Sequence, residues 1–457
     1  HTGRLMFSLF RAKGYEIYAI DTPERLAHRP APLPGRPGEL PPVDRTSALA
    51  GLLASAAAGL PADTSYPVRP YHAGLSLTYV GQPSLIAGSS QFGTYVGGGA
   101  ALYWSDLLAN HNLTTALQVN GGIKDVTGVV AYQDLGSRLN WGVAAQQIPY
   151  LTGAFAEGTT TVNGEPALVE QRLLDRQTNR SLQGIVAYPF SEVQRVELTG
   201  SLTHISFDRE LRTQAFSLLS GDRLVNETQN LATGDPLTLG SASAALVYDN
   251  SFFGATGPIL GQRYRLEATP TFGSIAFVGV LGDWRRYFMP VRPFTIAARL
   301  LHYGRYGGGG EDQRLQPLFL GYPGLVRGYR YGSFDASECN PPAGDPNSCP
   351  VFDRLLGSRI AVANLELRFP LFGALGIGPG YYGILPLDWI AFGDAGLAWQ
   401  SNIDPSFAGG DRKPVFSAGT GFRFNLFGFA VAEVNLVHPF DRPAKHWIWE
   451  LNLQPGF

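Results

Sequence analysis

Several features that mark common protein classes are missing from this sequence of 457 residues. It has no run of 18 apolar residues, which excludes a membrane-spanning helix. Charged residues make up only 16% of the chain, below the roughly 25% usual for soluble domains. The net charge of −2 gives no reason to expect a nucleic acid partner. The chain begins at His1 without a signal peptide, so we interpret it as a processed or partial product.

Cysteine is scarce. The two cysteines, Cys339 and Cys349, lie ten residues apart in "ECNPPAGDPNSC", a segment rich in Pro, Gly and Asn. Two thiols without further ligands nearby argue against a metal site. We therefore predict a local disulfide formed in an oxidising compartment, with free thiols as the alternative.

The first 70 residues differ in composition from the rest. Residues 1–21 predict two short strands joined by a turn at Ala12, Lys13 and Gly14. Residues 22–70 form a linker rich in Pro, Ala and Arg, in which "RTSALAGLLASAAAGL" predicts one short helix capped by Thr46 or Ser47. This helix is too short to span a bilayer, and a linker helix without a role is a simpler interpretation than a plug.

Residues 71–457 follow a different pattern, in which segments of about ten residues alternate apolar and polar side chains. In the terminal "HWIWELNLQPGF", one face of a strand would carry Trp447, Trp449, Leu451, Leu453 and Phe457. In "LDWIAFGDAGLAW", Trp389 and Trp399 share a face ten residues apart, and a tilted strand rises roughly 23 Å over that length. Aromatic residues at both ends of an apolar face favour a membrane barrel over a soluble sandwich.

We count sixteen such segments, which predicts an all-β fold: a 16-stranded antiparallel transmembrane β-barrel. An even number of strands closes without a free edge. The turns on one side are short, and the longest connections, 150–175, 212–239 and 305–356, all lie on the other side, as in outer-membrane barrels. The polar faces then line a hydrated lumen that contains Glu366 and Asp394.

The longest connection, between strands 11 and 12, contains "LGYPGLVRGYRYGSF" at residues 320–334. Its "VRGYRYGSF", together with "ANLELRFP" and "AFGDAG" in the next two strands, resembles the superfamily of BamA, TamA and the two-partner-secretion transporters. "YPFSEVQRVEL" and the terminal Phe457 are also similar, and the resemblance covers residues 71–457. It implies that this loop folds into the lumen. There Arg327 would bond Glu366 and Asp394, while Gly328 lets the backbone approach the wall and Tyr329 packs beside it.

The resemblance also implies a function: moving or inserting polypeptide at the bacterial outer membrane, with the N-terminus in the periplasm. The expected partners are membrane lipid, a polypeptide client and other periplasmic or outer-membrane subunits. Strands near 72–82 and 446–457 would form the seam where such barrels open. The POTRA domains usual before these barrels are absent, and "GRLMFSLFRAKGYEIYAID" instead resembles the end of a TolB-type propeller blade. We therefore expect the full protein to carry an N-terminal periplasmic propeller.

Three alternatives remain. The barrel could be a non-enzymatic anchor or scaffold for the propeller or a partner complex, or it could be a porin-like channel. Enzymatic function has little support, because the sequence has no H-E-x-x-H, G-x-S-x-G or phosphate-binding motif. His302 with Glu311 and Asp312 at the rim is a weak candidate for hydrolysis, and a solvated loop histidine is the simpler interpretation. No cofactor or metal is implied.

Overall fold

The computed structural model describes residues 5–11, 14–20, 51, 71–81, 84–90, 93–120, 123–339, 348–426, 430–442 and 444–453. The chain divides into two compact units, residues 1–71 and 72–457. In the first unit, β1 (Leu5–Arg11) pairs antiparallel with β2 (Gly14–Ile20). The sequence predicts these two strands. The expected linker helix lies, apart from Gly51, outside the described residues.

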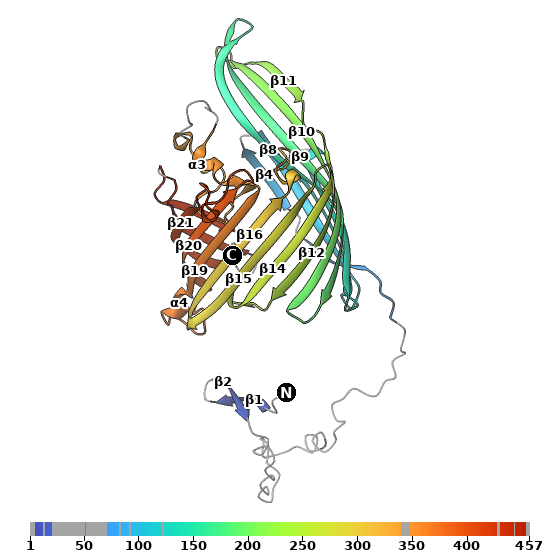
Figure 1. The fold of residues 1–457 in the computed structure, drawn as a ribbon, viewed down its shortest axis with the longest axis vertical. Helices are drawn as coiled ribbons and strands as arrows, with labels where there is room; N and C mark the ends of the chain where they lie inside the picture. The colour runs from blue at the N-terminus through green and yellow to red at the C-terminus, as the bar shows by residue number, and fades with distance from the viewer. Residues whose placement is uncertain are drawn as a thin grey trace, which may run out of the picture. The chain divides into compact units, whose positions relative to one another are not determined.

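The second unit is a barrel of antiparallel strands whose order closes on itself (Figure 1). Its first half contains β3 (Ser76–Val80), β4 (Ser84–Ser90), β5 (Gly93–Ser105), β6 (His111–Asn120), β7 (Val126–Asp134), β8 (Asn140–Val162), β9 (Glu165–Pro189), β10 (Gln194–Ser217), β11 (Arg223–Leu231) and β12 (Leu237–Asp249). The second half contains β13 (Phe252–Phe253), β14 (Pro258–Gly273), β15 (Phe277–Val291), β16 (Phe294–Tyr306), β19 (Arg359–Pro370), β20 (Leu387–Trp399), β21 (Val415–Leu426), β22 (Ala430–Pro439) and β23 (Ile448–Leu453).

The nineteen strands of this order form sixteen positions in the wall, within the part of the chain that the structure describes. Three are partial strands that share a partner with another: β3 and β4 both pair with β5, β11 and β12 both pair with β10, and β12 and β13 both pair with β14. The predicted sixteen-stranded barrel is therefore confirmed. No helix among the described residues is long and apolar enough to cross a membrane.

Two of the three predicted long loops are wrong. Residues 150–175 belong mostly to β8 and β9, which have 23 and 25 residues, and much of 212–239 belongs to β10, β11 and β12. Figure 1 shows β8 to β11 rising above the other strands. The β8–β9 hairpin closes at Asn163 and Gly164, with φ of 53° and 85°. An Asn-Gly pair with positive φ is the preferred two-residue hairpin turn, and the β8–β9 ladder continues up to it, as far as Val162 and Glu165.

The third predicted loop, between β16 and β19, is largely irregular. It contains the two-residue strands β17 (Leu318–Phe319) and β18 (Leu356–Gly357), the 3-10 turns η2 (Gly308–Glu311) and η3 (Ala336–Glu338), and the helical turn α3 (Pro350–Asp353). Residues of this inserted loop pack against wall residues of β16, β19, β20 and β21 in one buried apolar cluster: Leu301, Phe319, Leu320, Val326, Tyr329, Leu355, Ile360, Val362, Ala398 and Val415. The lumen next to these strands is thus filled, which corrects the prediction of a hydrated lumen for this half.

The alternation of faces agrees with the sequence in most strands. Trp447, Trp449, Leu451 and Leu453 are all exposed on the outward face, and Phe457 lies outside the described residues. Trp399 departs from the expected exposed girdle, because only 7% of it is exposed. It stacks on His302 and is covered by Phe407 from the following loop.

Candidate functional site

Arg327 lies at the tip of the inserted loop, inside the barrel, and is buried. Its Nε donates to Asp394 Oδ2 at 2.8 Å and its Nη2 to Asp394 Oδ1 at 2.8 Å, a two-point contact. Nη1 donates to Glu366 Oε1 at 2.7 Å, and the guanidinium stacks on Phe392 at 3.5 Å. Burial alone would lower the pKa of Arg327, but the Asp394 and Glu366 carboxylates outweigh it and raise that pKa, so the side chain stays charged.

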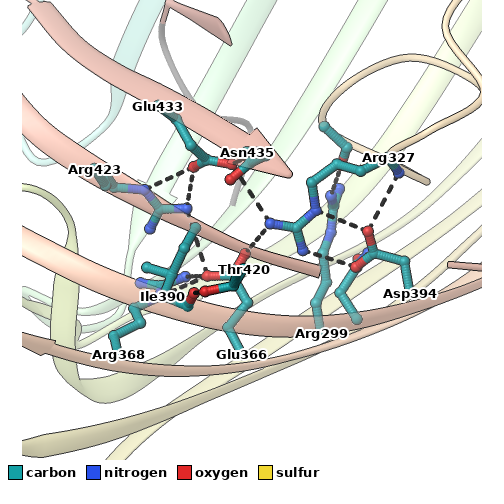
Figure 2. Close-up of polar contacts among 12 residues, drawn as sticks. Arg299, Arg327, Glu366, Arg368, Ile390, Asp394, Thr420, Arg423, Glu433 and Asn435 are labelled. Carbon is teal, nitrogen blue, oxygen red and sulfur yellow. Dashed lines mark hydrogen bonds and ion pairs between the residues drawn. The ribbon is translucent and has the colours of Figure 1, made fainter. Parts of the chain in front are cut away.

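The contact belongs to a larger network drawn in Figure 2. Glu366 accepts a second hydrogen bond from Arg368 Nε at 2.7 Å and also lies 3.4 Å from Arg423 Nη2. Arg423 Nε donates to Glu433 Oε2 at 2.8 Å, and Glu433 lies 3.5 Å from Arg327. Three arginines and three carboxylates are therefore buried together, and the cluster has no net charge. A buried cluster of charges is tolerated when it is paired in this way.

Strand alternation explains how the wall supplies these groups. Asn364, Glu366 and Arg368 alternate with outward residues along β19, and Asn364 lies directly opposite Asp394 of β20. Asn364 Nδ2 donates to Asp394 Oδ1 at 2.9 Å and to Leu325 O at 2.7 Å, so it orients the carboxylate and fixes the loop backbone. Arg423 and Glu433 were not among the site residues predicted from the sequence. Their alternation in "FRFNL" and "AVAEVNL" was the available signal.

Gly328 and Tyr329 bring the loop backbone against the last strands. Gly328 has φ of +90°, and a Cβ there would lie 3.0 Å from Val437 Cγ1, so glycine is needed on both grounds. Its N–H donates to Glu450 Oε1 of β23 at 3.1 Å. The Tyr329 hydroxyl donates to Phe416 O at 2.7 Å, and burial raises the pKa of this tyrosine.

A second attachment holds the upper part of the loop, and sequence reasoning missed it. Arg442, in the β22–β23 connection, donates to Glu338 Oε1 and Oε2 at 2.7 and 2.9 Å, and both side chains are fully buried. Arg442 also donates to Gly328 O at 2.9 Å and lies over the Phe334 ring. The hydrogen bonds from Arg442 lower the pKa of Glu338. Both partners come from irregular segments, so no periodicity could pair them.

The other residues named in the sequence analysis form a disulfide or make local hydrogen bonds. Cys339 and Cys349 form a disulfide, with Cα atoms 4.4 Å apart, directly after Glu338. His302 Nδ1 donates to Ile360 O, and its Nε2 accepts from Tyr306. Glu311 instead bonds Ser358 and Ser401, while Asp312 bonds Arg314. His302, Glu311 and Asp312 therefore each bond other residues and do not form one hydrolytic site. Among the described residues, no cluster of ligands suited to a metal ion is found.

A barrel of sixteen strands with a loop fixed inside its lumen defines a class of outer-membrane protein. Residues 176–448, more than half of the chain, match the Omp85 superfamily domain. The chain therefore belongs to the Omp85 superfamily, whose outer-membrane members insert or secrete polypeptides.

A solved structure shows the same fold. BamA from Haemophilus ducreyi lacking POTRA domains 1–3 is similar at 15% identity and a TM-score of 0.51, over 84% of this chain and 70% of that one. CdiB from Acinetobacter baumannii is similar at 12% identity and a TM-score of 0.42, over 81% of this chain and 58% of that one. No curated protein matches the chain.

Proposed function

We propose that this barrel moves or inserts a polypeptide client at the outer membrane, with the inserted loop as a fixed internal brace and the β3–β23 seam as the opening. The observation that carries the proposal is the buried contact of Arg327 with Asp394 and Glu366. Its value is positional, because a guanidinium shared by two carboxylates fixes the loop tip on two neighbouring strands.

A porin-like channel has less support. A passive pore needs a continuous hydrated passage, but Leu320, Val326 and Tyr329 of the inserted loop are fully buried against the wall. A loop that fills one side of the lumen narrows the passage and does not help small solutes to diffuse. It suits a barrel whose loop must hold a defined position while the wall changes.

The seam is the natural place for such a change. β23 has six residues and β3 has five, whereas β20 and β21 have 13 and 12. The two short strands are neighbours in the closed order, so the barrel closes through two short strands. Short ladders contribute few hydrogen bonds, so this boundary is the least costly to separate.

The N-terminal residues extend the proposal. We propose that residues 1–21 are the end of a TolB-like propeller blade in the periplasm, that 22–70 link it to the membrane, and that 71–457 form the barrel. The β1–β2 pair supports this for the first segment, since it supplies two adjacent strands of the kind that a blade contains.

A disulfide lock across the seam tests the proposal. Cysteine pairs that join Leu77 or Val80 of β3 to Trp449 or Leu451 of β23 are screened for the pair that oxidises in the folded barrel. Cells that depend on this protein are then compared by quantitative proteomics of the outer membrane and the medium. With the seam locked, we expect specific polypeptides to be lost from one of these fractions, and to return on reduction.

The matched control is a lock away from the seam. Ala298 and Leu365 are direct partners on the outward face of β16 and β19, so A298C with L365C gives a disulfide in the same type of wall. This control should leave both proteomes unchanged. If the seam-locked barrel sustains the same proteomes as the control, the translocation proposal fails, and a scaffold that anchors the N-terminal part becomes the better interpretation.

A further inference from the structure

The outward wall of β5 to β10 contains a shallow hollow of about 760 Å³. Its floor is apolar and formed by directly paired residues of neighbouring strands, among them Leu117, Val130, Leu182 and Leu202. Leu182 and Leu202 remain 60% and 57% exposed, so protein side chains do not cover them. In an outer-membrane barrel this face borders lipid, and the hollow can accept acyl chains.

The hollow is polar at one end only. On the side toward the β8–β9 hairpin tip, its lining changes to Gln147, Arg180 and His204. Arg180 is two residues from Leu182 on β9 and lies directly opposite His204 of β10. Cationic side chains at the edge of an apolar band lie at the level of lipid headgroups. A positive group immediately above an acyl-sized hollow fits an anionic lipid.

Arg180 differs from the neighbouring cations on the same face. Arg176 bonds Asp125 and Asp208, and Arg172 bonds Glu170. Arg180 instead donates to two neutral oxygens, Gln147 Oε1 at 2.8 Å and Ser206 Oγ at 3.5 Å. No ion pair of the described residues includes it, and its side chain is exposed. Its charge is therefore oriented but not neutralised by the protein.

We propose that this hollow binds lipopolysaccharide of the outer leaflet, with an acyl chain over Leu182 and Leu202 and a lipid A phosphate on Arg180. Arg180 lies on the side of β9 toward the long β8–β9 hairpin. In the orientation of the proposed function, on which this inference rests, that side is extracellular, so Arg180 lies in the outer leaflet. A phosphate supplies the anionic oxygens that the guanidinium lacks, and Gln147 holds the guanidinium in place for it.

Native mass spectrometry of the detergent-solubilised protein, titrated with purified lipid A, tests the site. Hydrogen bonds to charged groups contribute about 1.5–3 kcal/mol, so R180Q should weaken lipid A binding about tenfold or more. V130W, which fills the floor of the hollow without changing charge, should also weaken it. Heat-dependent gel mobility confirms that each variant is a folded barrel.

The control is R212Q, which removes an exposed arginine on the same face that is already paired with Glu210. It should bind lipid A within about twofold of the unchanged protein. Equal affinity of R180Q and R212Q would overturn the proposal. Equal binding of phosphatidylglycerol and lipid A by the unchanged protein would overturn the assignment to lipopolysaccharide in favour of an outer-membrane phospholipid.

Discussion

Two regions of this barrel use the same chemistry, arginine paired with carboxylate, under opposite conditions. Around the inserted loop the pairs are dry: the side chains of Glu366 and Asp394 are 0% exposed and that of Arg327 is 6% exposed. Along the tall β8–β11 extension several pairs are more exposed: Arg209 and Asp175 are 45% and 34% exposed, and Arg212 is 46% exposed. Buried pairs are costly to break singly, whereas exposed pairs contribute little. Charge therefore fixes the position of the loop in the lumen, whereas in the tall hairpins it mainly maintains solubility.

The largest effect should come from Arg327→Ala. Removing one partner of a buried ion pair costs about 3–5 kcal/mol, because it leaves Asp394 and Glu366 with an uncompensated charge. We expect the inserted loop to leave its position and become sensitive to protease, while the barrel stays heat-modifiable on gels. Limited proteolysis followed by mass spectrometry of the fragments measures this. A loop as resistant as in the unchanged protein would refute the view that the dry pair positions it.

The disulfide should have the next largest effect. Cys339 and Cys349 close a segment of about eleven residues, and the chain-entropy model gives about 2–3 kcal/mol for such a loop. In C339S/C349S we expect faster hydrogen exchange in the segment around Glu338, with protection at Arg327 retained. Hydrogen exchange of C339S/C349S and of the unchanged protein, measured in parallel, checks this. Loss of protection at Arg327 as well would mean that the Glu338–Arg442 contact and the Arg327 contacts open together as one cooperative unit.

Gly328→Ala should have a smaller effect. A residue with a Cβ pays about 1–2 kcal/mol for the left-handed conformation and also crowds Val437. We expect partial release of the loop, intermediate between the unchanged protein and Arg327→Ala in the same proteolysis assay. Gly332→Ala is a suitable control, since Gly332 also has positive φ but nothing lies within 4 Å of its Cβ position. Equal release in both variants would show that backbone strain, not the approach to β22, decides the effect.

The smallest effect should come from the β8–β11 extension. Arg212→Ala breaks a pair in which Arg212 is 46% exposed, and Glu210 keeps Lys124 as a partner, so we expect a loss of at most about 1 kcal/mol. We expect protease resistance of the loop to stay the same. The melting temperature of the barrel should fall slightly at low ionic strength and should not change beyond experimental error at higher salt. Melting at two salt concentrations tests this. A shift as large as that of Arg327→Ala would remove the distinction between the two regions.

Much of this site could be predicted from alternation alone. Glu366 and Asp394 occupy the polar, alternate positions of two neighbouring strands. A side chain in a strand of the barrel points either into the lumen or outward, so its direction follows once the strand is recognised. The resemblance then supplied Arg327, which no periodicity could place in the lumen. The pair Glu338–Arg442 joins two irregular segments, and the sequence carries no signal for such a contact.

The tall hairpin was missed for a different reason. We ended the strands at the height of a bilayer, but β8 to β10 continue in register to the Asn163–Gly164 turn. The turn dipeptide is visible in "TVNGEP" and could have corrected the prediction. For Trp399 the predicted outward face is correct, but its burial is not predicted. The burial comes from contact with His302 and Phe407, which depends on tertiary packing.

The buried network also determines which part of the wall is stiff. The inserted loop bonds to β19 and β20 through Glu366 and Asp394, to β21 through Phe416, to β22 through Glu433 and to β23 through Glu450. These strands are consecutive in the wall, so the loop joins them into one rigid block that ends at the seam. No such cross-brace joins β3 to β7 in the described residues. In the proposed opening of the seam, β23 therefore stays with its block, and the edge that moves aside is β3.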